Sequence, residues 1–228
     1  MLLQTPRQPS QRSFNNLTEI KIPPKSNLLC ALAVGLLGLP APAKADTLTL
    51  NDGGVTKLEV VARAGGGANQ IENLSPTSIP FNGSHVAVQS DSRGQATYYL
   101  GPDEFTITSS GARMGSLDSR ANVQPVIFFS VSVDTRYNIR GTFSVDDPGL
   151  SAKYAEFTTT LADLNTSANL FHNSQASRGV VDTSFVLGGA AGNRINELTG
   201  SATGILTAGH QYRLYYGSSI YADNSGDP

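Results

Sequence analysis

The sequence predicts an all-β protein, an antiparallel β-sandwich of the jelly-roll or Greek-key type. Three observations favour this class. Short runs of alternating apolar and polar residues recur along the chain, clusters of Gly, Asn and Asp separate them, and no long segment has clean helical spacing. The 23 glycines and the 15% of charged residues agree with many short strands joined by tight turns.

The chain length bounds the domain organisation. A chain of 228 residues is long enough to bury one sizeable core, so its folding requires neither disulfides nor a structural metal. We expect three parts: a signal peptide over residues 1–45, a single β-sandwich domain over 46–221 and a flexible tail over 222–228.

The N-terminal segment has the composition of a secretory signal. An apolar run covers residues 28–39, Lys21 and Lys25 precede it, and small residues follow it. A helix of this length spans about 18 Å, too short for a hydrocarbon core of about 30 Å, so we expect no membrane span in the mature chain. A buried core helix is the alternative, and Pro40 and Pro42 just downstream disfavour it.

The cleavage site follows from the side chains after the apolar run. Signal peptidase requires small residues at the two positions it recognises, and Ala43 and Ala45 supply them, so we expect cleavage before Asp46. The only cysteine, Cys30, is then lost, which excludes disulfides, thiol catalysis and thiolate metal sites from the mature chain. We therefore expect a secreted protein, extracellular or at the cell surface.

The charge distribution restricts the classes of partner that we expect for the mature chain. Residues 1–45 carry five Lys or Arg and one acid, so the remainder has 11 basic and 17 acidic residues, a net charge of about −6. An acidic domain repels phosphate backbones and anionic lipid, which argues against nucleic acid and membrane surfaces as partners. Extracellular polysaccharide and other surface proteins remain.

From residue 46 onward, the expected strands follow one another in short runs. The first, Thr47–Leu50, leads into Asn51–Gly54, whose residues tolerate positive φ and predict a tight turn. The most apolar run, Val126–Val133, predicts a central core strand. The other expected strands cover residues 58–62, 85–89, 96–100, 105–108, 136–145, 180–187 and 204–216, with a last one opening at Tyr221.

Two segments leave alternatives open. Residues 153–164 place Tyr154, Phe157 and Leu161 at helical spacing, but three consecutive threonines at 158–160 favour a strand over a helix. Within 136–145 the alternation slips once, which indicates a β-bulge at Gly141.

A tyrosine corner is the clearest local motif. Leu206, Gly209 and Tyr212 have its Leu-x-x-Gly-x-x-Tyr spacing at the start of a strand. Glycine permits the sharp turn, leucine fills the end of the core, and the tyrosine hydroxyl bonds back to nearby backbone. The motif is typical of Greek-key sandwiches, and we expect its role to be structural.

No sequence motif indicates catalysis. The three histidines, His85, His172 and His210, have no metal-ligand spacing, and the serines lie in no G-x-S-x-G elbow, so we expect a non-enzymatic protein without catalytic residues or a bound cofactor. Asp146 and Asp147 are the candidates for a calcium site, although no spaced acidic loop surrounds them and a solvated turn is the favoured interpretation.

Two tyrosine pairs offer a binding surface. Because side chains alternate along a strand, residues 98–99 and 215–216 each place one ring on either face of a sheet. We take Tyr98 and Tyr215 as candidates for stacking on a ligand such as a sugar. Tyrosines on an exposed strand also stabilise cross-strand pairs without any ligand, and this second interpretation is favoured.

The C-terminal third resembles bacterial exported proteins of the PEP-CTERM type and related surface β-sandwiches. The resemblance covers residues 180–189, 198–209 and 212–216, where a strand follows an Ala-Gly-x-x-Tyr turn. It implies an exported surface protein and supplies no catalytic residues. The Pro-Glu-Pro sorting tail of that family is missing from residues 223–228, so we expect either a freely released protein or a truncated chain.

Together these observations predict a secreted or cell-surface, non-enzymatic β-sandwich with a structural, matrix or adhesion role. Two alternatives stay open. One is a carbohydrate-binding module that uses tyrosine faces and acidic loop edges. The other is a hydrolase whose Ser-His-Asp triad or acid pair is assembled only by folding.

Overall fold

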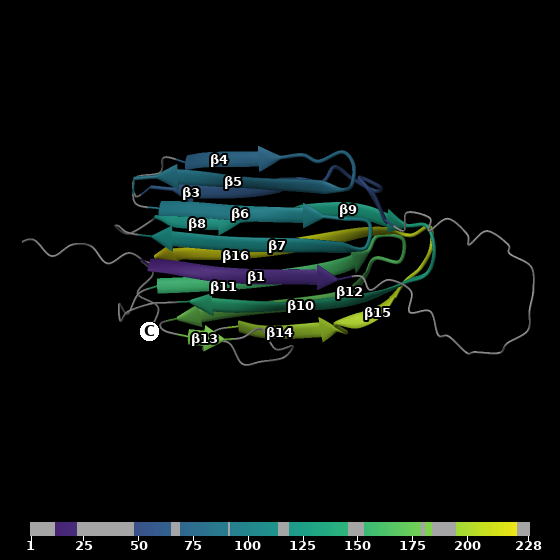
Figure 1. Cartoon of the computed structure of the whole chain (residues 1–228). Coiled ribbons are helices and arrows are strands. Elements are labelled where there is room, and N and C mark those ends of the chain that lie inside the picture. The colour runs from purple at the N-terminus through teal and green to yellow at the C-terminus, as the bar shows by residue number, and fades with distance from the viewer. Residues whose placement is uncertain are drawn as a thin grey trace, which may run out of the picture.

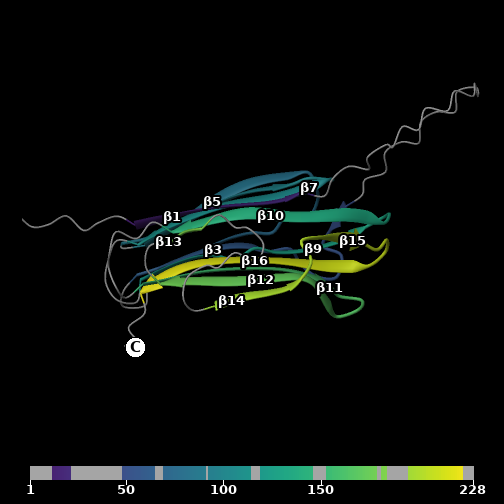
Figure 2. The same cartoon turned by 90° about the horizontal axis from the view of Figure 1, so that it is seen from below.

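The computed structural model describes residues 12–21, 48–64, 69–90, 92–113, 119–145, 153–178, 181–183 and 195–222. These residues form sixteen strands and no helix, which confirms the predicted all-β class. The strands make two antiparallel sheets of seven and nine strands. Seen from below, the sheets lie one above the other as the two layers of a sandwich (Figure 2).

Sheet A has seven strands in the order β13-β10-β1-β7-β6-β5, and β15 also pairs with β10. Its middle is occupied by β1, which lies between β7 and β10. The bounds of its strands are Arg12–Lys21 (β1), Phe81–Gln89 (β5), Ser92–Leu100 (β6), Glu104–Arg113 (β7), Thr135–Val145 (β10), Val181–Thr183 (β13) and Thr203–Leu206 (β15).

Sheet B has nine strands and is organised around β16, its longest. One edge of β16 pairs with β11, and the other pairs first with β9 and then with β8. The order is β14-β12-β11-β16-β8-β3-β4, with β2 paired to β9. The strands are Leu48–Leu50 (β2), Leu58–Arg63 (β3), Asn69–Leu74 (β4), Arg120–Val123 (β8), Val126–Val131 (β9), Lys153–Asp163 (β11), Ala168–Arg178 (β12), Ile195–Gly200 (β14) and Gln211–Ala222 (β16).

The core lies between the sheets and follows from the period-two alternation. Along β6, every second residue from Ser92 to Leu100 is buried. Aromatic rings bridge the layers: the ring centroids of Phe105 on β7 and Phe129 on β9 are 5.3 Å apart with an interplanar angle of 88°. This edge-to-face contact is a favoured geometry for aromatic pairs, and burial of such rings supplies much of the folding free energy.

A polar seam crosses the middle of this core. The hydroxyl oxygen of Ser109 on β7 lies 2.6 Å from that of Tyr216 on β16 and 3.3 Å from that of Ser218. All three residues are buried, and buried hydroxyls are tolerated when they bond to one another. The two sheets are therefore held together by hydrogen bonds as well as by apolar contact.

The strands depart from the expectations at several points. Residues 153–163 form strand β11, so the helix expected as an alternative is wrong. The hairpin of β11 with β12 has a register shift between Leu161 and Ala162. The register of β10 with β1 runs through Gly141 without a break, so that pairing has no bulge there. The apolar run at 126–131 is β9, buried on one side only and placed between β2 and β16.

Some strands were not expected at all. These are β1, β4, β8, β12 and β14, whose sequences are short or rich in polar residues. The expected strand over 204–216 is two strands, β15 and β16, separated by the tyrosine-corner turn. The expected strand over 180–187 is described only as β13, Val181–Thr183.

The segment assigned to the signal peptide is described only in part. Residues 12–21 of it form β1, whereas the apolar run, Ala43, Ala45 and Asp46 lie outside the described residues, as does the tail from residue 223. None of the described segments forms a helix long and apolar enough to cross a membrane.

Candidate functional site

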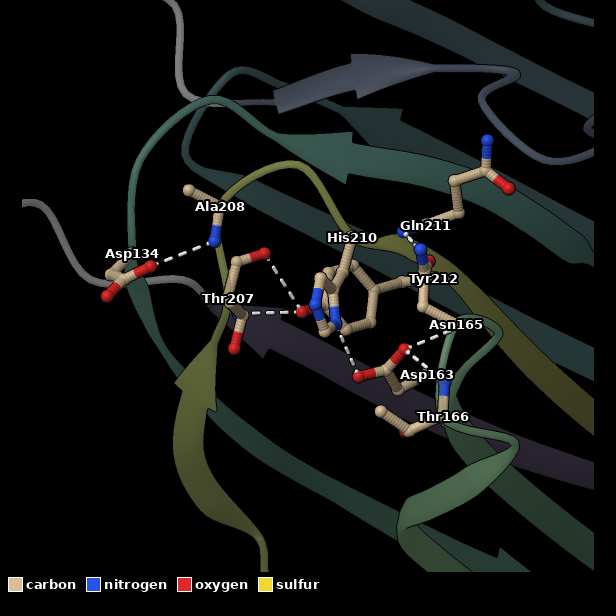
Figure 3. Close-up of polar contacts among 9 residues, drawn as sticks. All are labelled: Asp134, Asp163, Asn165, Thr166, Thr207, Ala208, His210, Gln211 and Tyr212. Atoms are coloured by element: carbon tan, nitrogen blue, oxygen red, sulfur yellow. Dashed lines mark hydrogen bonds and ion pairs between the residues drawn. The ribbon is translucent and has the colours of Figure 1, made fainter.

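Polar residues from separate turns meet at one end of the sandwich (Figure 3). They come from the turn between β11 and β12, the turn between β15 and β16, and the loop between β9 and β10. We call this group the end cluster, and its members are Asp134, Asp163, Asn165, His210, Gln211 and Tyr212.

Asp163 is the centre of the end cluster. Its Oδ1 accepts hydrogen bonds from the backbone N–H groups of Asn165, at 2.9 Å, and Thr166, at 3.3 Å, which closes the turn after β11. Its Oδ2 lies 2.8 Å from Nδ1 of His210 in a different turn. Asp163 is 5% exposed, so a buried carboxylate joins two turns.

The charge state of Asp163 follows from these contacts. Burial alone raises the pKa of a carboxyl group, but the hydrogen bond from His210 and those from the two backbone amides outweigh it, so the pKa of Asp163 is lowered. The carboxylate is therefore ionised at neutral pH. An ionised carboxylate only accepts hydrogen bonds, so Nδ1 of His210 carries the hydrogen and donates it.

Tyr212 holds the turn between β15 and β16. Its hydroxyl accepts a hydrogen bond from the N–H of Thr207 at 2.6 Å and donates to the carbonyl of the same residue at 3.1 Å. Leu206 is fully buried, and Gly209 has a φ of 75°, in the left-handed region that favours glycine. The structure thus brings Leu206, Gly209 and Tyr212 together in the geometry of a tyrosine corner.

Two further contacts fix the same turn from outside. Asp134 Oδ1 accepts the N–H of Ala208 at 2.8 Å, and the N–H of Gly209 donates to the carbonyl of Val131 at 2.9 Å. These bonds tie the corner turn to the end of β9 and to the loop that follows it. Every backbone bond of this kind satisfies a polar group that would otherwise be left open at a strand end.

The start of β16 is tied to two neighbouring turns. Asn165 Oδ1 accepts the N–H of Gln211 at 2.7 Å, and the carbonyl of Gln211 accepts the N–H of Leu164 at 2.9 Å. The side-chain amide of Gln211 donates to Asp52 Oδ1 at 2.9 Å. Asp52 lies in the turn between β2 and β3, so β16 is connected to that turn as well.

The two other histidines, His172 on β12 and His85 on β5, do not belong to the end cluster. His172 on β12 faces outward from sheet B, with Nδ1 2.9 Å from Thr160 Oγ1 and Nε2 3.7 Å from Glu197 Oε2. The three residues come from adjacent strands, and the glutamate side chain is 70% exposed. This is the arrangement of cross-strand neighbours on a solvated sheet face.

His85 on β5 is half-buried and contacts the core. Its Nε2 lies 3.1 Å from the hydroxyl of Tyr98, and its Nδ1 is buried without a hydrogen-bond partner among the described residues. Burial lowers the pKa of His85, and the nearby Glu72 opposes that effect in part. Burial also raises the pKa of Tyr98, so both groups stay neutral at physiological pH.

The two tyrosines proposed for ligand stacking have different surroundings. Tyr98 is 1% exposed and packs against His85 inside the sandwich, so its ring has no free face for a sugar. Tyr215 is half-buried on the outer face of sheet B, because its neighbours Leu214 and Tyr216 point into the core. Of the two candidates, only Tyr215 therefore lies on an outward face of a sheet.

The acidic candidates for calcium are not placed. Asp146 and Asp147 lie outside the described residues. In the part of the chain that the structure describes, no three His, Cys, Asp or Glu side chains come together as a metal site would require.

Sequence reasoning missed the pairing of Asp163 with His210. The residues are 47 positions apart in the sequence, and neither lies in a sequence motif that predicts the other as its partner. A local signal was present in Asp163-Leu164-Asn165, because an aspartate at the end of a strand often accepts backbone N–H groups two and three residues later. The partner across the end of the sandwich depends on which turns the topology brings together.

Comparison with known proteins gives no relative for this chain: no family model, no curated protein and no solved structure matches it.

Proposed function

We propose that this chain is an exported, non-enzymatic β-sandwich protein with a structural role in the extracellular matrix or in adhesion at the cell surface. The observation that supports the structural role is that the polar groups of the end cluster bond to the backbone of turns. The carboxylates of Asp134 and Asp163, the amide of Asn165 and the hydroxyl of Tyr212 each bond to backbone of a turn. Groups that hold turns in this way stiffen the end of a sandwich.

Export is supported by the sequence before β2. A basic flank, an apolar run over residues 28–39 and an Ala-x-Ala site form the order of parts that secretion requires. The resemblance of residues 180–189, 198–209 and 212–216 to PEP-CTERM-type surface proteins agrees with the same destination. Polysaccharide or other surface proteins are then the partners we propose.

The location is tested by fractionating cells that express the full chain with a C-terminal tag. We expect extracellular or surface-bound protein whose first residue, measured by mass spectrometry, is Asp46. The matched control replaces both Ala43 and Ala45 by Arg, which blocks the signal peptidase and leaves the longer chain. Recovery of full-length wild-type protein from the cytosol contradicts export.

The structural role is tested with a strain that lacks the gene. We expect reduced matrix retention or cell adhesion, restored by the wild-type chain and equally by the variant His210→Gln. Glutamine can still donate to Asp163, so the turns stay joined, but it cannot act as a base. If a folded His210→Gln protein fails to restore retention or adhesion, the result would instead favour a hydrolase built on the Asp163–His210 pair.

Carbohydrate binding is a second candidate, which the outer face of sheet B favours. Tyr215 lies there with a row of hydroxyl groups, and Thr158 Oγ1 and Ser174 Oγ are 3.0 Å apart across β11 and β12. A flat face with one aromatic ring and several hydroxyls suits an extended polysaccharide. In a sedimentation assay with insoluble polysaccharides, Tyr215→Ala should abolish binding, whereas Tyr99→Ala on sheet A should retain it; equal binding by both variants contradicts this candidate.

A further inference from the structure

β1 lies between β7 and β10 in sheet A, and these two strands are not hydrogen-bonded neighbours of each other. All ten of its residues pair with β7, from Arg12 opposite Arg113 to Lys21 opposite Glu104. Its other edge pairs with β10, from Phe14 opposite Val145 to Lys21 opposite Asn138. Because β1 is antiparallel to both neighbours, β7 and β10 run parallel to each other and stand about two strand spacings, roughly 10 Å, apart.

This central strand belongs to the segment that export is expected to remove. Cleavage before Asp46 would separate residues 12–21 from the domain that contains β7 and β10. The two strands would then face each other with open rows of N–H and C=O groups. Such edges bind extended peptide strands through main-chain hydrogen bonds.

The floor of this gap is formed by sheet B. In Figure 1, β1 lies over β16 and β11. The buried residues on the inner faces of those strands include Phe157 and Tyr216, which are apolar in large part, and the polar Thr159 and Ser218. The Oγ1 atom of Thr159 is buried and has no hydrogen-bond partner among the described residues. A strand that covers this floor has to be apolar in part and polar in part.

The sequence of residues 12–21 has that mixed pattern at the matching positions. The core-facing residues of β7 are Phe105, Ile107, Ser109 and Gly111, and the residues opposite them in register are Ile20, Thr18, Asn16 and Phe14. Of these four residues, the apolar Phe14 and Ile20 fall towards the two ends of the gap, and the polar Asn16 and Thr18 fall in its middle.

We propose that the gap between β7 and β10 is a binding site for one extended peptide strand, and that the segment Arg12–Lys21 is its ligand. The segment is supplied by its own chain before processing and, after processing, by a second chain that still carries residues 12–21. Export cleavage then converts a self-complemented sandwich into one that takes a strand from outside. The change on cleavage rests on the proposed export, whereas the binding site itself does not. Export is tested separately, by measuring the first residue of the secreted protein.

The first experiment cuts the folded full chain. A specific protease site is inserted within residues 22–27, in a Cys30→Ser background, and the cut protein is passed through gel filtration. We expect the N-terminal fragment to co-elute with the remainder and to exchange with a labelled synthetic peptide of residues 12–21. The control peptide carries Leu17→Pro, which removes a backbone donor in the middle of the strand, and should bind at least about tenfold more weakly.

The second experiment tests the register. Leu17 is opposite Thr108 of β7, and directly opposite residues in an antiparallel pair lie within disulfide distance. The full chain with Leu17→Cys, Thr108→Cys and Cys30→Ser should therefore form a disulfide under mild oxidation. The control with Thr106→Cys, two residues out of register, should not. Mixing a Leu17→Cys chain with a Thr108→Cys chain should give a disulfide-linked dimer when the strand is donated between copies.

The outcomes separate the proposal from its rivals. Binding of the residue 12–21 peptide together with the in-register disulfide supports it. A fragment that separates on cutting, or a residue 12–21 peptide that does not bind the remainder, overturns it. These results are independent of where signal peptidase cuts, so export can fail while the strand site stands, or the reverse.

Discussion

Asp163 and His210 lie 2.8 Å apart, Oδ2 to Nδ1, although Asp163 ends β11 at its hairpin with β12 and His210 lies in the turn that leads from β15 in sheet A to β16 in sheet B. The aspartate also accepts two backbone N–H groups of its own turn. One buried carboxylate therefore fixes the path of the chain after β11 and the entry into β16. This relationship has measurable consequences for stability.

Replacing Asp163 by alanine should reduce the free energy of unfolding by about 1–3 kcal/mol, because three hydrogen bonds to a charged acceptor are lost. The matched control is Asp134→Ala, whose exposed carboxylate accepts one backbone N–H, and it should cost about 1 kcal/mol or less. Urea unfolding at neutral pH measures both. Equal losses in the two variants would mean that the contacts of Asp163 contribute no more than a single surface bond.

The same carboxylate makes stability depend on acid. Its folded pKa is lowered below the ordinary value of 3.8, so the unfolded chain binds more protons in that range. The stabilisation is complete above about pH 5 and is lost as the pH falls through the folded pKa. The difference in unfolding free energy between wild type and Asp163→Ala should be constant from about pH 8 to about pH 5 and shrink below about pH 4. A difference that persists unchanged at the lowest pH contradicts this assignment.

The tyrosine corner predicts a second contrast. Tyr212→Phe removes the hydroxyl that accepts from and donates to Thr207, so it should cost about 1–3 kcal/mol of stability. Tyr215→Phe on the outer face of the same strand should change stability by less than about 0.5 kcal/mol. Chemical denaturation of the two variants beside wild type tests this. A neutral Tyr212→Phe would show that the corner hydroxyl is dispensable.

The fold class and most strands were predictable because alternation and turn residues are local signals. The runs at 58–62, 96–100 and 105–108 all lie within observed strands, since one side of each is buried and the other is not. β4 and β12 were missed because Asn69–Leu74 and Ala168–Arg178 are mainly polar and become strands through their neighbours. Tertiary context overrides weak local preference in such segments.

The candidate site was predictable only where its residues are close in sequence. Leu206, Gly209 and Tyr212 carry their spacing within a few residues, so the corner was visible. The pairing of Asp163 with His210 requires the β11–β12 hairpin turn to meet the turn between β15 and β16, and the burial of Tyr98 depends on which face of β6 meets sheet B. Alternation in the sequence predicts that a strand has two different faces, but it does not by itself show which face is buried against the other sheet.

Two glycines with nearly the same backbone conformation should respond differently to substitution. Gly200 has a φ of 77°, and a Cβ there would clash with the carbonyl oxygen of Leu170. Gly209 has a φ of 75°, and a Cβ there would meet nothing within 4 Å. Gly209→Ala should therefore cost about 1–2 kcal/mol, from left-handed strain alone.

Gly200→Ala has the same strain and adds a clash with backbone, so it should cost more than about 3 kcal/mol. The carbonyl of Leu170 also accepts the N–H of Ser201 at 3.0 Å, so moving it away breaks a hydrogen bond. Thermal unfolding of the two alanine variants gives the comparison. A Gly200→Ala protein as stable as Gly209→Ala would mean that β14 and β12 separate easily at this point.

His85 predicts a loss of stability in mild acid, apart from the range in which Asp163 titrates. Burial lowers its folded pKa below the ordinary 6.5, so the unfolded chain binds more protons just below that pH. Stability should therefore fall as the pH drops from about 7 towards the folded pKa. The variant His85→Gln keeps a side-chain amide that can bond the hydroxyl of Tyr98 but does not titrate, so its stability should fall less over the same range. His172→Gln on the outer face controls for the loss of an imidazole as such, and urea midpoints measured between about pH 8 and about pH 5 compare all three proteins. If the urea midpoints of wild type and His85→Gln fall equally with pH, the loss of stability in mild acid does not come from protonation of His85.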